Sequence, residues 1–88
     1  MRIWFKIFDD ARLIKTETIE NYDEDTRTHK IFNSLEEACN IFDLGKPIWL
    51  DTNIYEFKKS SKTRFTKDNF IEEIDFDYLE MIVLEEDY

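Results

Sequence analysis

Alternation of apolar and polar residues predicts one strand at each end of the chain. Side chains two residues apart share a face of a strand. Residues 2–8 and 74–84 carry apolar side chains on both faces, which is typical of strands in the middle of a sheet. In the first strand, one face holds Ile3, Phe5 and Ile7, and the other holds Trp4 and Phe8 with Lys6. In the second strand, one face holds Ile74, Phe76, Tyr78, Ile82 and Leu84, and the other holds Leu79, Met81 and Val83. We expect the two strands to lie side by side.

Residues 12–21 predict a further strand, because Thr and Ile favour strands and alternating Lys and Glu suit an exposed face. It would form a hairpin with residues 2–8 and lie nearer the sheet edge. The connection Asp9–Ala11 lacks glycine, so no tight type I′ turn is expected. Thr26–Phe32 is predicted as a short strand or an extended lead-in.

The clearest helix signal covers residues 35–44. Ser34 and Glu37 have the S-x-x-E spacing of a capping box. Apolar residues then recur at helical spacing, and Gly45 would end the helix at its C′ position. The stripe consists of Leu35, Ala38, Cys39 and Phe42.

A short buried strand or extended segment, Ile48–Leu50, precedes a second predicted helix, Thr52–Lys59, capped by Asp51 or Thr52. Ser60–Lys67 then predicts a polar, basic loop. A following turn is expected to bury Phe70 and Ile71.

These elements predict one small α+β domain over residues 1–88. It would have a mostly antiparallel sheet of three to five strands, with two short helices packed on one face. Aromatic residues make up 16% of the chain and can fill a small core. Residues 85–88 are expected to fray as an acidic tail.

The charge is distributed unevenly along the chain. From Asp68 onward there are nine acidic residues and no Lys or Arg, whereas residues 1–67 hold twelve of each sign. The formal net charge of −9 therefore comes from the last part of the chain. Such crowding of like charge requires solvent, basic neighbours or a partner. The candidate basic neighbours are Lys58, Lys59, Lys62, Arg64 and Lys67.

Helices on one sheet face only would leave the other face open to a partner. We predict a protein partner, basic in character, or a second copy of the chain. The candidate surface comprises Asp75, Asp77, Glu80, Glu85, Glu86, Trp4 and Met81.

No catalytic motif is present, and the sequence predicts neither a cofactor nor a metal. The single histidine, His29, is expected to be an ordinary surface residue, and Cys39 a buried thiol. The acids at 23–25 and the pair Asp75 and Asp77 lack the spacing of a calcium-binding loop. The single cysteine and the short N-terminal apolar run predict a cytoplasmic protein without a membrane segment.

The leading hypothesis is a non-enzymatic, acidic protein-interaction module, a bacterial or mobile-element accessory factor. One form of it is an inhibitor that presents carboxylates in place of nucleic-acid phosphates. The acidic balance argues against nucleic-acid binding. Nucleic-acid binding nevertheless stays an alternative, through the segment Lys58–Lys67 with Arg27, His29 and Lys30. A further alternative is a small metal-binding or catalytic protein.

Overall fold

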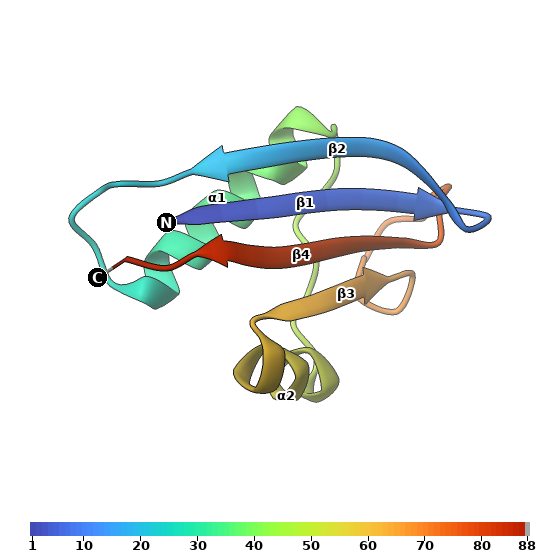
Figure 1. Ribbon diagram of the computed structural model, residues 1–88. Coiled ribbons are helices and arrows are strands. Elements are labelled where there is room, and N and C mark those ends of the chain that lie inside the picture. Colours follow the sequence, from blue (N-terminus) through green and yellow to red (C-terminus); the bar gives the residue numbers. More distant parts are fainter. Residues whose placement is uncertain (88) are drawn as a thin grey trace.

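Strands β1 (Arg2–Asp9) and β4 (Tyr78–Glu85) lie side by side in the middle of a four-stranded antiparallel sheet. The computed structural model describes residues 1–87 (Figure 1). The strand order is β2-β1-β4-β3, with β2 (Arg12–Glu20) and β3 (Lys62–Thr66) at the edges. The α+β class and the central pairing of the first and last strands are confirmed.

The register between β1 and β4 decides which face of each strand enters the core. Phe5 lies opposite Met81 and Ile7 opposite Leu79, and all four side chains are buried. The prediction that Met81 belongs to a partner surface is therefore wrong. The sequence placed Met81 correctly on the same strand face as Leu79 and Val83. Antiparallel pairing, however, aligns this face with the face of β1 that holds Phe5 and Ile7, and both faces enter the core. The opposite, open face of the sheet carries Trp4, Lys6, Phe8, Tyr78, Glu80 and Ile82.

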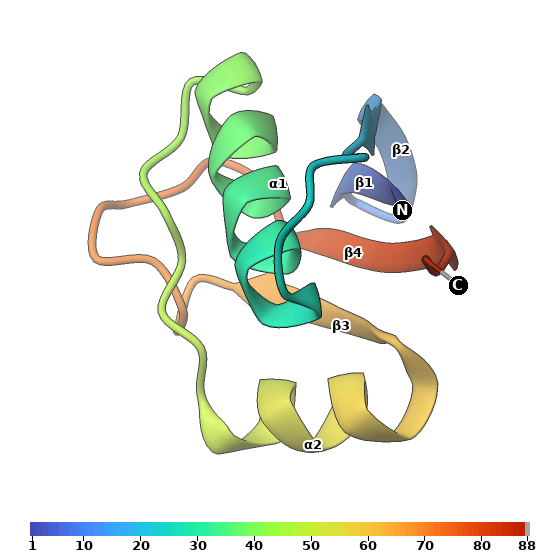
Figure 2. The same ribbon diagram turned by 90° about the vertical axis from the view of Figure 1, so that its left-hand side faces the viewer.

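Helix α1 (Arg27–Ile41) covers the core face of the sheet (Figure 2). It begins eight residues earlier than predicted, so the proposed strand at Thr26–Phe32 is wrong. The Thr26 side chain is the N-cap and accepts a hydrogen bond from the His29 N–H. Ser34 is therefore a fully buried residue within the helix and not its cap. The apolar stripe begins upstream of Ser34, at Ile31.

The end of α1 also differs from the prediction. Asp43, with φ of 59°, takes the left-handed position, and the Leu44 N–H donates to the Cys39 carbonyl. Gly45 instead leaves room for the Glu72 side chain, whose carboxylate would have to move if another residue stood here. A Cβ at this position would lie 2.4 Å from Oε1 of Glu72, which accepts a hydrogen bond from the Gly45 N–H.

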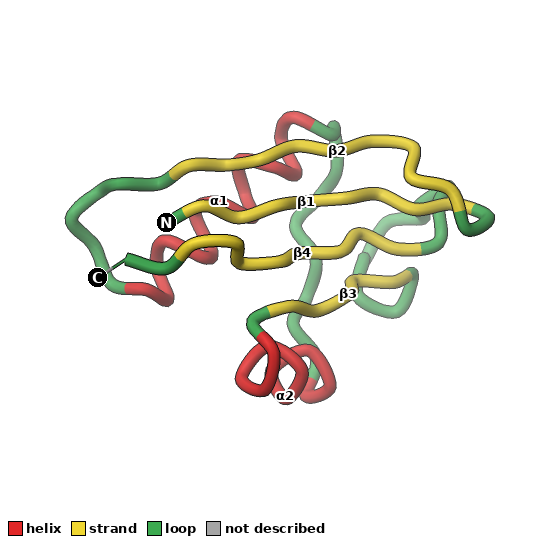
Figure 3. Tube along the Cα trace, viewed as in Figure 1, coloured by secondary structure: helices red, strands yellow, loops and turns green. Residues whose placement is uncertain are grey.

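Helix α2 (Asp51–Ser60) lies beside β3 at the lower sheet edge in Figure 1. The predicted second helix is thus present, within one residue at each end. The predicted loop Ser60–Lys67 is instead mostly β3, which Figure 3 colours as a strand. A single residue, Ser61, with φ of 55°, connects α2 to β3. Segment 42–50 contains no strand, and Trp49 packs its ring edge-to-face against Phe57 and Phe65.

Both sheet edges are protected. Along β3, the buried Asn53 side chain donates to the Arg64 carbonyl, and the Asn69 side chain accepts from the Thr66 N–H. Along β2, a bulge interrupts the register with β1 between Ile7 and Phe8. The β1–β2 turn places Asp10 and Ala11 at φ of 51° and 60°, the left-handed geometry of a type I′ turn that the sequence did not predict. Among residues 1–87, no helix has the length and apolar character to cross a membrane.

Candidate interaction surface

The nine C-terminal acids divide into two groups of different environment. Four of them have a cationic group within 4 Å, namely Glu80, Glu85, Glu86 and Asp87. The other five form no ion pair with any residue in the described range 1–87, namely Asp68, Glu72, Glu73, Asp75 and Asp77. These five all lie in residues 67–77, between β3 and β4, which we call the acidic loop.

Glu80 pairs with two cationic side chains on the open sheet face. Its carboxylate lies 3.2 Å from both Lys6 Nζ and the Arg64 Nε. Lys6 Nζ also lies 4.1 Å from the centre of the Trp4 ring, and the Arg64 guanidinium 4.5 Å from the Tyr78 ring. Charges on this face are therefore satisfied internally, and Trp4 and Glu80 belong to a structural network.

The last acids are held by residues near the start of α1. Glu86 binds Arg27 at 2.7 Å, and Asp87 binds both Lys30 and the Met1 ammonium. Hydrogen bonds from Arg27 and from Lys30 lower the pKa values of Glu86 and Asp87 respectively. Glu85 ends β4 and lies 3.6 Å from Arg2. Residues 85–87 thus form ion pairs with the rest of the fold. Tyr88 lies outside the described residues, and the fraying of residues 85–88 stays a prediction.

Two carboxylates of the acidic loop accept hydrogen bonds from backbone N–H groups elsewhere in the fold. Near its middle, Glu72 accepts from the Gly45 N–H at 2.6 Å. At its end, Asp77 accepts from the Asp10 N–H at 2.9 Å, which supports the β1–β2 turn. Glu72 and Asp77 therefore have structural partners, while no such bond engages the carboxylates of Asp68, Glu73 or Asp75 among the described residues.

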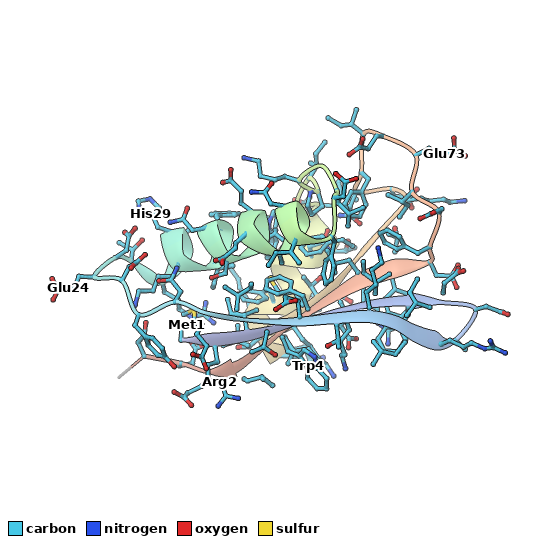
Figure 4. The ribbon with its side chains drawn as sticks, turned by 90° about the horizontal axis from the view of Figure 1, so that it is seen from above. Met1, Arg2, Trp4, Glu24, His29 and Glu73 are labelled. Atoms are coloured by element: carbon cyan, nitrogen blue, oxygen red, sulfur yellow. The ribbon has the colours of Figure 1, made fainter. Side chains whose placement is uncertain are left out.

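Ile71 projects from this loop into solvent. Its neighbour Phe70 is buried and packs edge-to-face on Phe76, whereas Ile71 is 89% exposed, the highest value among the large apolar residues described. The prediction that both residues are buried is wrong for Ile71. Figure 4 shows Glu73, two residues on, at the outer margin of the molecule on the side of α1.

The surroundings of the loop add further negative charge. A hollow of about 430 Å³ is lined by Asp43 and Leu44, from the end of α1, and by loop residues 72–75. Lys46 lines the same hollow as Ile71 and Glu72, and its Nζ lies 3.8 Å from Glu36. The loop thus presents one strongly exposed aliphatic side chain next to several carboxylates and one lysine.

The basic segment is divided by the fold. Lys59, Lys62 and Arg64 line a hollow of about 390 Å³ together with Tyr55 and two glutamates. Lys58 instead lines a different hollow, between α1 and α2. Of the five basic residues, only Arg64 pairs with one of the nine acids among the described residues. Lys67 is exposed at the start of the acidic loop.

The remaining candidate basic residues are already engaged. Arg27 binds Glu86, and Lys30 is buried against Asp87. His29 is exposed, and its Nδ1 lies 2.9 Å from Asp25. A hydrogen bond from the Thr26 N–H, followed by the contact with His29, lowers the pKa of Asp25. These groups do not join Lys59, Lys62 and Arg64 in lining their hollow.

The remaining chemical candidates have ordinary structural environments. Cys39 is fully buried in α1, and burial raises the pKa of its thiol to about 11, so the thiolate is scarce at neutral pH. Within residues 1–87, no three His, Cys, Asp or Glu side chains converge in a way that could hold a metal ion.

The feature that sequence reasoning missed is the exposure of Ile71. Its signal is the dipeptide Phe70-Ile71 next to Glu72-Glu73. In a turn, two adjacent apolar side chains seldom both face the core, so one of them was a candidate for the surface. Comparison with protein-family models, with curated proteins and with solved structures finds no match for the chain.

Proposed function

We propose that the chain is a non-enzymatic protein-interaction module that binds a basic partner through the acidic loop. One observation carries the proposal. Ile71 is 89% exposed within a loop whose five carboxylates lack ion pairs among the described residues, while the other four C-terminal acids are paired.

The two features have complementary roles in binding. Exposed carboxylates steer a basic partner toward the loop and set the salt dependence of association. An exposed aliphatic side chain supplies apolar surface that binding would remove from water. The partner accordingly offers an apolar pocket with cationic groups around it.

The test is affinity capture from the native host with the wild-type chain and two variants of equal charge. The loop variant combines Asp68→Asn, Glu73→Gln and Asp75→Asn, none of whose carboxylates accepts a hydrogen bond among the described residues. The control variant combines Asp23→Asn, Glu24→Gln and Glu37→Gln, three exposed acids outside the loop.

We expect the loop variant to lose the partner and the control variant to retain it. Equal loss in both variants would indicate a nonspecific charge effect and would contradict the proposal. A captured DNA- or RNA-binding protein would identify the form in which carboxylates take the place of phosphates.

Nucleic-acid binding is a second candidate, supported by the convergence of Lys59, Lys62 and Arg64 on one hollow beside the exposed Tyr55. Arg64 is already shared with Glu80, which weakens this reading. A low-salt gel shift that is lost on Lys59→Gln and Lys62→Gln substitution would favour it.

A further inference from the structure

A second exposed apolar feature lies between the two helices. Phe32, in α1, and Ile54, in α2, are 47% and 41% exposed, although both border a hollow of about 240 Å³. We call this hollow the α1–α2 groove. Its lining consists of the apolar residues Ile31, Phe32, Trp49, Ile54 and Phe57, with Arg27, Thr28 and Lys58.

The charged residues of the groove are both cationic. Lys58 is exposed and has no carboxylate within 4 Å among the described residues. The Arg27 guanidinium lies 5.2 Å from the centre of the Phe57 ring and is held by Glu86. An apolar floor with this rim suits an aliphatic side chain flanked by carboxylates.

The acidic loop of the same chain has that chemistry. Ile71 is its exposed aliphatic residue, and Glu72 and Glu73 follow directly. Figure 4 places Glu73 and His29 toward opposite ends of the molecule, and His29 is in the first turn of α1, beside the groove residues Arg27 and Thr28. Ile71 is 89% exposed, so it does not occupy the groove of its own molecule.

We infer that the α1–α2 groove receives Ile71 from the acidic loop of a second copy of this chain. Glu73 of the incoming loop would lie near Lys58. The inference rests on the proposed function, because it names one partner for the surface proposed above. Two copies that exchange both contacts form a closed dimer, whereas copies that each make one contact to the next form larger rings or open chains.

Sedimentation equilibrium tests the inference by measuring the average mass of the chain from about 10 µM to about 1 mM. The ionic strength is physiological, because a Debye length of about 8 Å then screens repulsion between the net negative charges. We expect the mass of the wild-type chain to rise with concentration. Ile71→Ser should weaken association by roughly ten- to a hundredfold, the effect of burying one such side chain. Leu13→Ser, at a residue 49% exposed on β2, is the control and should change nothing.

A mixing experiment makes the test specific to the two surfaces. Ile71→Ser removes the loop contact, and Ile54→Glu blocks the groove with a like charge. Circular dichroism would detect whether Ile54→Glu unfolds the chain. In that case Lys58→Glu, at an exposed residue, is the milder groove variant. Neither variant should associate alone, but an equimolar mixture should form a one-to-one dimer through the intact groove and the intact loop.

Three results would overturn the inference: a monomeric wild-type chain at about 1 mM, unaltered association of Ile71→Ser, or no dimer in the mixture. The proposed function is judged on different evidence: it fails if the loop variant and the control variant capture the same partner, and it survives the loss of the groove inference. If the chain stays monomeric but the loop variant loses a captured partner that the control variant keeps, the acidic loop is an interaction surface for another protein and the groove is not its target.

Discussion

Asn53 offers the sharpest test of what holds β3 and α2 together. Its side chain is 2% exposed and uses its full hydrogen-bonding capacity of two donors and two acceptors. The amide nitrogen donates to Thr63 Oγ1 and to the Arg64 carbonyl, both at 2.8 Å. The amide oxygen accepts from the Leu50 N–H at 3.0 Å and from the Asn69 side chain at 2.7 Å.

Asn53→Ala would break all four bonds at once. Thr63 would keep Glu56 as a partner, and Asn69 would keep the Ile48 carbonyl. The Arg64 carbonyl and the Leu50 N–H would lose their side-chain partner. An unsatisfied buried group costs about 1–3 kcal/mol, and because these two bonds are only part-buried the expected cost is about 2–3 kcal/mol in total. This is a large fraction of the roughly 5–15 kcal/mol by which such domains are stable.

Urea unfolding followed by circular dichroism measures the change in the free energy of unfolding. Asn40→Ala is the matched control, because Asn40 is exposed in α1 and its substitution should stay within about 0.5 kcal/mol of wild type. A loss for Asn53→Ala no larger than that of the control would refute the role assigned to this network. Asn69→Ala and the double variant would complete a mutant cycle, in which direct contact predicts non-additive losses.

Two further predictions concern titration. Because Glu86 and Asp87 have lowered pKa values in the fold, their ion pairs stabilise it above the unfolded pKa values near 4, and this stability is lost as pH falls through the lowered values. Acid unfolding of Glu86→Gln should therefore be less steep than that of wild type, and an identical profile would argue against the Arg27 pairing. For Cys39, burial and a pKa of about 11 predict negligible reaction with a thiol reagent at pH 7 until urea unfolds the chain, whereas rapid labelling of the native protein would contradict its placement.

Period-two patterning identified β1 and β4 and their central position, since apolar side chains on both faces of a strand are visible in the local sequence. The same patterning could not decide which face of β4 was covered. That depends on register with β1, a contact between residues more than seventy positions apart, and it moved Met81 from a proposed surface into the core. The start of α1 was misread because Thr26 and Thr28 have strand propensity, while Ile31 and Leu35 already follow the helical stripe.

The sequence showed that acidic residues are concentrated in the last part of the chain, but not which of them have cationic neighbours in the fold. Four of the nine acids found cations from β1, β3, α1 and the N-terminus, all brought near by the fold. Only after this pairing does the acidic loop stand out as the part left unpaired among residues 1–87. Composition counts charges along the chain, whereas interaction energy depends on their separation in space.

The sequence by itself determined the α+β class, the central strand pair, the second helix and the net charge, because each follows from local periodicity or simple counting. Tertiary structure decided that β3 is a strand, that Gly45 makes room for Glu72, and that Ile71 is exposed while Phe70 is buried. These outcomes depend on contacts between distant segments. Local propensity carries no information about which of two adjacent apolar side chains such contacts will cover.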